Sequence, residues 1–426
     1  MLLIKNGLVI DPSQDLCEKK DILVKDGKIA QVKSEILSEA ECNTIDAAGC
    51  IVAPGLVDVH VHFRDPGFTY KEDIESGARA AVKGGFTSVV LMANTKPAVD
   101  NKETITYVIE KGKTVDLNVY TCATVTKAMA GRELTDMDQL SSCGAAGFTD
   151  DGIPIMDEAL LEEAFRNGSR LHVPISLHEE DPSLIANNGI NQGKASAHFG
   201  IGGSPREAEI SLVARDLKIA LKTGAILNIQ HISAKESVQL VREAKRRAAQ
   251  NGSGNIHAEA TPHHFSLTEE AAIQYGTLAK MNPPLREEAD RLAIIEGLRD
   301  GTIDIIATDH APHSKEEKEK AITEAPSGII GLETALALGI TTLVEENGFS
   351  QMQLLQRMST NPAKLYGLNA GTLAEGAPAD IVIYDPKESR TAGNYRSKAS
   401  NSPFTGRKLQ GVVKYTIVCG NIVYRD

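Results

Sequence analysis

The middle of the chain alternates short apolar runs with longer amphipathic stretches. Apolar runs that predict buried strands begin near Ala53, Gly85, Val115, Gly144, Pro174, Ile226, Asn255 and Ile303. The first five starts are 29–32 residues apart, close to the roughly 30 residues of a strand-plus-helix unit. Helical patterns lie between later runs, at 157–167, 207–222 and 235–250. Eight such units predict a closed (β/α)8 barrel of the TIM type.

Both ends of the chain predict β structure instead. Residues 22–32 alternate around an Asp-Gly pair, which is a hairpin signal. The C-terminal strand-like segments are 379–385 and 412–426. Neither end carries enough apolar strand to fold alone. We therefore expect residues 1–53 and 366–426 to form one small β-sandwich domain beside a catalytic barrel of residues 54–365.

Composition narrows the class of protein. The chain has 45 Lys+Arg against 57 Asp+Glu, a net charge of −12, which argues against nucleic acid or an anionic membrane as partner. No run approaches the roughly 18 apolar residues of a membrane span, and Lys5 and Asp11 come too early for a signal peptide. The six cysteines form no C-x-x-C pair, so the sequence signals neither a thiolate zinc site nor a thioredoxin-type site. We expect a soluble, cytoplasmic protein whose cysteines are buried and whose KEEKEK run (315–320) is solvated.

Histidines and aspartates end several predicted strands. In such a barrel the catalytic groups sit where the strands end. His60 and His62 lie two apart on one strand and so face the same side. The other candidates, each at a strand end, are Asp150, Asp151, His178, His231, Asp309, His310 and His313.

This set is larger than the three protein ligands of a single catalytic zinc. It fits two metal ions bridged by a shared carboxylate and a hydroxide. Imidazole and carboxylate ligands without thiolate suit Zn²⁺, with Mn or Co as alternatives. Asp150 and Asp151 compete for the bridging role, and their spacing does not choose between them. We expect the remaining histidines to be structural or not to bind metal: His172, His198, His257, His263 and His264.

Five longer strings resemble one enzyme family. They are HVHFRDPG (60–67), MANTKP (92–97), FTDDG (148–152), KMNPPLR (280–286) and ATDHAPH (307–313). Together they are similar to the class I dihydroorotases of the amidohydrolase superfamily. The resemblance covers nearly the whole chain.

The resemblance implies an activity and a metal centre. The activity is the zinc-dependent, reversible cyclisation of N-carbamoyl-L-aspartate to L-dihydroorotate in pyrimidine biosynthesis. Two zinc ions would be bridged by Asp151 and a hydroxide, with no carboxylated lysine. Asp309 would also be the catalytic acid–base group. The implied zinc ligands are His60, His62 and Asp309 on one ion, His178 and His231 on the other, and Asp151 on both.

Arg64 is the residue that the sequence itself suggests for substrate binding. It follows His62 by two residues, so we expect it on the same strand face, where its guanidinium suits an α-carboxylate. The resemblance adds further substrate contacts. These contacts are Asn94 and His313 to the carboxylate, and Asn282, Ser327 and Gly328 to the pyrimidine ring. We also expect the loop after His313, which contains the KEEKEK run, to form a lid over the substrate.

Two other functions stay open. A hydantoinase or allantoinase would perform similar chemistry, but its substrates lack the carboxylate that Arg64 would bind. An inactive dihydroorotase-like scaffold that supports aspartate transcarbamoylase need not keep the metal ligands that this chain keeps. The expected partner is a small-molecule substrate. We also expect a homodimer, and an association with aspartate transcarbamoylase is a further hypothesis.

Overall fold

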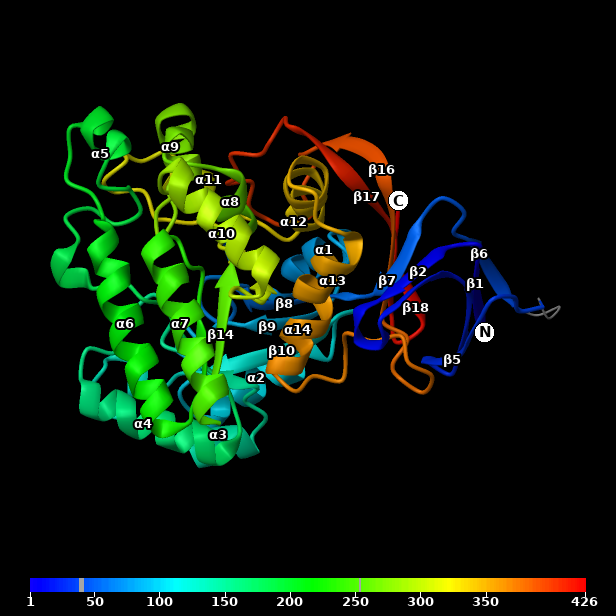
Figure 1. Cartoon of the computed structure of the whole chain (residues 1–426), viewed down its shortest axis with the longest axis horizontal. Coiled ribbons are helices and arrows are strands. Elements are labelled where there is room, and N and C mark those ends of the chain that lie inside the picture. Colours follow the sequence, from blue (N-terminus) through cyan, green and yellow to red (C-terminus); the bar gives the residue numbers. More distant parts are fainter. Residues whose placement is uncertain (38–41, 253) are drawn as a thin grey trace.

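Eight parallel strands follow one another around a nearly closed barrel (Figure 1). They are seen in a computed structural model that describes residues 1–37, 42–252 and 254–426. The predicted (β/α)8 barrel is therefore confirmed. The strands are β8 (Leu56–Val61), β9 (Phe86–Leu91), β10 (Asn118–Ala123), β11 (Gly147–Phe148), β12 (Ile175–Leu177), β13 (Ile226–Ile229), β14 (Asn255–Ala260) and β15 (Ile305–Ile306).

The barrel closes at the carboxyl ends of its first and last strands. The His62 N–H donates to the His310 carbonyl oxygen at 2.9 Å, and Val61 forms a parallel bridge with His310. The Thr308 N–H donates to the Asp58 carboxylate at 3.1 Å. These bonds join the ends of β8 and β15, where the sequence places candidate ligands.

Helices cover the outside of the barrel, with α4, α6, α7 and α10 prominent in Figure 1. Every residue of β8 and β9 is buried, because helices cover one face of a parallel strand and the barrel interior covers the other. The three predicted helices are confirmed, with boundaries that differ by up to four residues. The helices are α1 (Ile74–Lys83), α2 (Lys102–Gly112), α3 (Met137–Ser142), α4 (Glu158–Leu171), α5 (Lys194–Phe199), α6 (Arg206–Thr223), α7 (Lys235–Asn251), α8 (Pro262–Ser266), α9 (Glu270–Tyr275), α10 (Glu288–Asp300), α11 (Lys315–Lys318), α12 (Ala335–Leu338), α13 (Gln351–Leu355) and α14 (Asn361–Leu365).

The two ends of the chain form two sheets beside the barrel (Figure 1). One sheet has the order β5-β4-β1-β6, and the other has the order β18-β17-β16-β7-β2-β3. Apolar side chains from both sheets, including Ile4, Val52 and Ile383, share one core. The predicted β sandwich is confirmed, while its division from the barrel after residues 53 and 365 stays a prediction. The strands are β1 (Leu2–Lys5), β2 (Leu8–Asp11), β3 (Leu16–Lys19), β4 (Asp21–Lys25), β5 (Lys28–Lys33), β6 (Asn43–Asp46), β7 (Ile51–Pro54), β16 (Ile381–Thr391), β17 (Lys408–Val418) and β18 (Asn421–Arg425).

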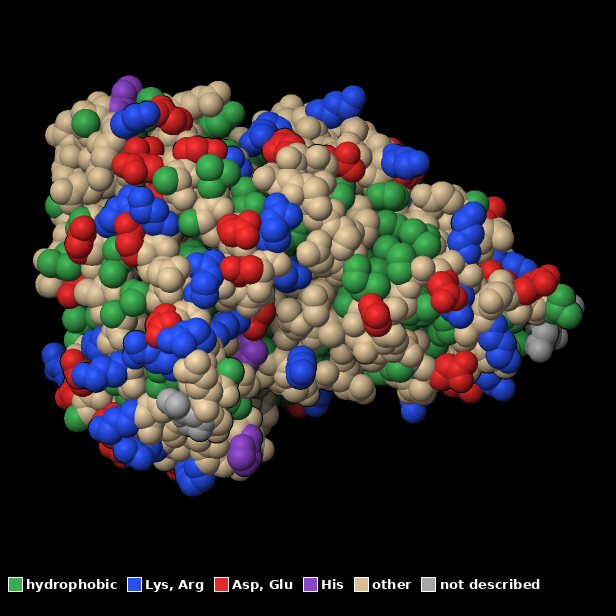
Figure 2. All heavy atoms as spheres, in the orientation of Figure 1, with side chains coloured by type: hydrophobic (Ala, Val, Ile, Leu, Met, Phe, Trp, Pro, Cys, Tyr) green, Lys and Arg blue, Asp and Glu red, His purple; other side chains and the backbone are tan. Residues whose placement is uncertain are grey.

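Two expectations are wrong: not all cysteines are buried, and the KEEKEK run is not wholly solvated. Among the six cysteines only Cys122 is fully buried; Cys17 lies exposed on the edge strand β3, and Cys419 lies exposed in the turn between β17 and β18. In the KEEKEK run Lys318 is buried, because its ammonium group points back into the protein. Acidic and basic side chains are interspersed over the barrel helices on the face in Figure 2. The described residues include no helix with the length and apolarity of a membrane span.

Candidate metal centre and active site

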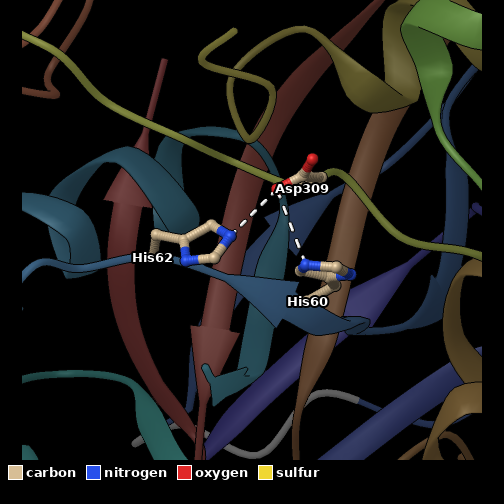
Figure 3. Close-up of side chains that lie close together, drawn as sticks. All are labelled: His60, His62 and Asp309. Carbon is tan, nitrogen blue, oxygen red and sulfur yellow. Dashed lines mark hydrogen bonds and ion pairs between the residues drawn. The ribbon is translucent and has the colours of Figure 1, made fainter. Parts of the chain in front are cut away.

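His60, His62 and Asp309 converge at the carboxyl end of the barrel (Figure 3). The Asp309 Oδ1 atom lies 3.0 Å from His62 Nε2 and 3.5 Å from His60 Nε2. His60 is the fifth residue of β8, and His62 follows the last residue of that strand. All three side chains are buried. The structure thus brings together the H-x-H pair and the aspartate that follows the last strand.

Asp151 lies between this group and a second one. Its Oδ1 atom is 3.5 Å from His60 Nε2 and 3.6 Å from His231 Nε2, and its Oδ2 atom is 3.4 Å from His62 Nε2. His178 Nδ1 lies 3.0 Å from His231 Nε2 and 3.9 Å from Asp151 Oδ1. One carboxylate therefore contacts imidazoles on both sides.

Asp150 is turned away from this cluster. Its carboxylate accepts the Val125 N–H at 2.8 Å and the Thr126 N–H at 3.2 Å. It therefore holds the loop after β10. Of the two aspartates that the sequence leaves as alternatives, the structure brings Asp151 to the histidines.

The spacing of these donor atoms fits metal ions. A tetrahedral zinc with bonds of about 2.0–2.1 Å places its ligand atoms roughly 3.3 Å apart. Two groups have their ligand atoms within 4.8 Å of one another, namely His60, His62 and Asp309, and His60, Asp151 and His231. In addition, the buried His60 Nε2 has no hydrogen-bond partner in the described residues. An imidazole nitrogen left free among carboxylates is what a bound cation would satisfy.

A polar network beneath the cluster orients His60. The His60 Nδ1–H donates to Glu259 Oε2 at 3.0 Å, which directs Nε2 into the cluster, where a metal ion would take the place of its proton. Asn228 Nδ2 donates to Glu259 Oε1 at 2.5 Å and to Ser176 Oγ at 3.1 Å. Ser176 Oγ in turn lies 2.7 Å from the Tyr366 hydroxyl. The network thus connects four barrel strands, β8, β12, β13 and β14, with the segment after α14.

The other imidazoles have supporting partners too. Glu180 Oε2 lies 3.3 Å from His178 Nε2, where it forms an ion pair with the ring when the ring is protonated. The His62 Nδ1–H donates to Asn94 Oδ1 at 2.9 Å. Glu180, Glu259 and Asn228 are not among the site residues expected from the sequence. The available signal is a carboxylate or amide inside, or just after, an otherwise apolar barrel strand.

The pKa values of the clustered side chains are shifted by burial and by the close contact of imidazoles with carboxylates. Burial lowers the pKa of His60, but Asp151, Asp309 and Glu259 raise it well above the ordinary value. Burial raises the pKa of Asp309, yet His60 and His62 bring it below its usual range. Asp309 is therefore a carboxylate at neutral pH, as both a ligand and a proton acceptor must be.

Three residues around the cluster have left-handed backbone. The φ angles are +59° at Arg64, +31° at His231 and +46° at Asp309. Such conformations cost about 1–3 kcal/mol each outside glycine and concentrate at functional sites. They also correct the expectation for Arg64. Because β8 ends at Val61 and the chain turns at Arg64, this residue does not lie on the strand face of His62.

Arg64 still reaches the site, through the turn. Its Nη2 atom lies 3.5 Å from His313 Nε2, and its Nε–H donates to the Pro312 carbonyl oxygen at 3.4 Å. Burial, together with Arg64 and Lys71, lowers the pKa of His313 to about 2. The neutral His313 ring donates from Nε2 to the Ser327 carbonyl oxygen at 2.9 Å and accepts from Lys71 Nζ at Nδ1.

Three other residues predicted to contact the substrate have neighbours within the protein at the site. Besides supporting His62, Asn94 donates to Asp151 Oδ2 at 3.3 Å. Asn282 Nδ2 lies 3.3 Å from His178 Nε2, and its buried Oδ1 has no hydrogen-bond partner in the described chain. The Gly328 N–H donates to the carbonyl oxygen of Lys280. This amide hydrogen is therefore already used, and a ring contact by Ser327 or Gly328 stays a prediction.

The other histidines separate into two kinds. His263 and His264 are buried near the cluster, where His264 Nε2 donates to the Pro283 carbonyl oxygen. Neither belongs to the two groups that could hold a metal. His257 pairs with Asp304 at 2.7 Å, and the exposed His172 and His198 occupy helix ends, as expected of structural histidines.

Lys318 holds the loop that carries Ser327. Its Nζ donates to the carbonyl oxygens of Pro326 at 2.8 Å and Gly328 at 3.1 Å. Burial and the neighbouring Lys280 lower the pKa of Lys318 to about 7. Between pH 7 and about 10 the unfolded chain therefore binds more protons at this position than the folded chain does, so folding stability rises with pH.

We expect Lys318→Met to remove this dependence. Between pH 7 and pH 9 the unfolding free energy of the wild type should gain about 2 kcal/mol relative to the variant. Denaturant unfolding of both proteins at the two pH values measures the difference. Lys315→Met, an exposed lysine of the same helix, is the matched control. A difference that stays constant with pH contradicts the assignment.

Comparison with known families agrees with this fold and cluster. Residues 51–423 match the model of the Amidohydrolase family. The chain belongs to the amidohydrolase family. This metal-dependent amidohydrolase family accounts for both the barrel and the grouping of histidines with aspartates at its mouth.

Relatives within the amidohydrolase family match over the full length. A dihydroorotase from Clostridioides difficile (strain 630) is 57% identical over 424 residues, covering 100% of each chain. A dihydroorotase from Streptococcus pneumoniae serotype 4 is 51% identical over 427 residues, also covering 100% of each. The L-hydantoinase from Arthrobacter aurescens has a similar structure, with a TM-score of 0.89 and 27% identity over 100% of this chain and 96% of its own. The predicted resemblance to dihydroorotases, and with it a cyclic amide hydrolase, is confirmed.

Proposed function

We propose that this amidohydrolase catalyses the reversible cyclisation of N-carbamoyl-L-aspartate to L-dihydroorotate, a step of pyrimidine biosynthesis. The observation that carries the proposal is Arg64. Its guanidinium lies partly buried beside the cluster and forms no ion pair with any carboxylate among the described residues. A cation withdrawn from water needs a partner, and both substrate and product bring an α-carboxylate. Hydantoin and allantoin do not.

We assign the metal centre to two zinc ions. Asp151 contacts imidazoles of both groups, so the bridge requires no carboxylated lysine. When bound, the ions would supply Lewis acidity that polarises the ring amide carbonyl and activates water near neutral pH. The side chains that would hold them are His60, His62 and Asp309 for one ion, His178 and His231 for the other, and Asp151 for both.

Asp309 moves the proton in this mechanism. In hydrolysis its carboxylate takes the proton of the attacking water and delivers it to the departing ring nitrogen. In ring closure the same group, protonated, helps expel water. Arg64 binds the α-carboxylate throughout, and the unpaired Oδ1 of Asn282 is an acceptor for a ring N–H. Ring closure consumes a proton, so acid should favour dihydroorotate.

Substrate choice tests the proposal. The wild type should hydrolyse L-dihydroorotate and leave hydantoin nearly untouched. Arg64→Met should lower kcat/KM on dihydroorotate about 30-fold or more, since losing one partner of such a pair typically costs about 2–5 kcal/mol, while zinc content stays the same. Arg79→Met, an exposed arginine on α1, is the control. Hydantoin turnover as fast as dihydroorotate turnover would instead support a hydantoinase.

Assembly and location stay predictions. We expect a homodimer in the cytoplasm, and sedimentation of the purified chain, alone and with aspartate transcarbamoylase, tests self-association and that partnership. An inactive scaffold is the less favoured function because the six candidate ligands are brought together at the barrel mouth.

A further inference from the structure

A segment from outside the barrel contacts the loops at the barrel mouth. Residues 395–405 lie in the connection between β16 and β17, both strands of the terminal sandwich. The segment is nevertheless fastened to the barrel. The Ser397 hydroxyl and the Lys398 N–H donate to Glu72, and the Ser397 N–H donates to Glu333 Oε1 at 3.1 Å. The segment thereby reaches the loop after β8, which carries Glu72, and the chain after β15, which carries Glu333.

Asn401 is the residue of this segment that enters the mouth, where it is only 3% exposed. Its Nδ2 donates to the carbonyl oxygens of Ala311 at 3.0 Å and Gly328 at 2.9 Å. Its Oδ1 accepts the His313 N–H at 3.1 Å, and its carbonyl oxygen accepts the Ile330 N–H at 3.0 Å. Both amide hydrogens and both oxygens of Asn401 are thus used on two neighbouring segments.

The His313 segment and the Gly328 segment pair directly through their backbones only near Ile329. Beyond that point, the bonds of Asn401 join them. The Ala311 N–H donates to the Ile329 carbonyl oxygen at 3.0 Å, next to an isolated parallel bridge between His310 and Ile329. Beyond this point a side-chain amide, which has the donors and acceptor of a peptide group, takes the place of the next backbone pair.

The two segments also approach too closely for a side chain between them. A Cβ at Gly328 would lie 2.6 Å from the Ala311 carbonyl oxygen and 2.7 Å from His313 Cδ2, and φ at Gly328 is +153°. Glycine permits this close approach because it has no side chain. The hydrogen bonds of Asn401 then hold the two segments at this distance. The two features act on the same contact between the His313 segment and the Gly328 segment.

We propose that Asn401 is a positioning residue for substrate binding. This inference rests on the function proposed above. By joining the His313 and Gly328 segments, Asn401 sets the place of the His313 ring, which lies 3.5 Å from the Arg64 guanidinium. It thereby shapes the carboxylate-binding side of the pocket. Asn401 bonds to none of the six candidate metal ligands, so its effect should fall on substrate affinity rather than on metal content.

Two substitutions separate this role from general stability. Asn401→Asp keeps the shape but directs a carboxylate oxygen at two carbonyl oxygens, and Asn401→Ala removes the amide without adding repulsion. We expect KM for L-dihydroorotate to rise about tenfold or more in the first variant and at least about threefold in the second. In both, kcat should stay within about threefold of the wild type, and zinc content should be unchanged. Ser400→Ala, the exposed neighbour, should match the wild type.

The outcomes distinguish the two proposals. An unchanged KM in both Asn401 variants overturns the positioning role. A loss of zinc, a parallel fall in kcat, or insolubility of both variants overturns it too, because the amide would then support the barrel mouth as a whole. A wild type that neither binds L-dihydroorotate in calorimetry nor turns it over refutes the proposed function first, and the positioning role with it.

Discussion

Asp309→Asn should keep two zinc ions and lose at least ~100-fold in turnover, the low end of typical general acid–base contributions. Asparagine retains the size of the side chain and one ligand oxygen, but it cannot carry a proton at ordinary pH. The Asp309 carboxylate lies 3.0 Å from His62 Nε2 and 3.5 Å from His60 Nε2. Its two tasks, holding a metal and moving a proton, can therefore be separated by this one change.

The loss should appear in both directions of the reaction, because one group serves hydrolysis and ring closure. Rates of dihydroorotate hydrolysis and of N-carbamoyl-L-aspartate cyclisation, measured on zinc-replete protein, make the comparison. Zinc content measured on the same sample is the control. Near-normal turnover with both ions bound would show that the proton travels by another route, with His263 and His264 as the next groups to substitute.

Asp151→Ala should abolish the metal centre itself. This carboxylate lies within 3.4–3.6 Å of a ring nitrogen of His60, His62 and His231. Its removal leaves both groups of ligands without their shared member. Loss of a residue that merely supports a ligand weakens metal binding 10–100-fold, so we expect loss of this ligand to exceed ~100-fold and activity to become nearly undetectable.

Zinc per chain after dialysis, with activity measured in parallel, provides the test. Asp150→Asn is the matched control, because Asp150 accepts hydrogen bonds from Val125 and Thr126 and faces away from the histidines. That variant should keep its zinc, even if its loop after β10 is less stable. Unchanged zinc in Asp151→Ala would show that another group holds the ions.

Much of this site follows from sequence order alone. Parallel strands of a barrel end on one face, so polar residues that terminate successive strands must meet there. That rule groups His60 and His62 with His178, His231 and Asp309, although His60 and Asp309 are 249 residues apart in the chain. Spacing could not choose between Asp150 and Asp151, because which neighbour faces inward depends on the local turn.

Other features depend on facts that a linear pattern does not contain. Glu259 lies within a barrel strand, and only the packing of adjacent strands shows that it meets His60 rather than solvent. Arg64 reaches the site through a left-handed turn, which strand periodicity cannot represent. Lys318 belongs to a run of charges that usually marks a solvated surface, yet backbone carbonyl groups draw it inward. Asn401 contacts the mouth from a segment of another sheet.

The pairing of β7 with β16 has a consequence for how the protein is made. Pro54 lies opposite Ile381. Strand β7 is therefore synthesised more than three hundred residues before its partner β16. A ribosome adding ~5–20 residues per second takes roughly 15–65 s over that interval. Throughout it the growing chain displays an apolar strand edge, the kind of surface that recruits chaperones or other unfinished chains. A polypeptide released before β16 would therefore be an aggregation hazard rather than a partly active enzyme.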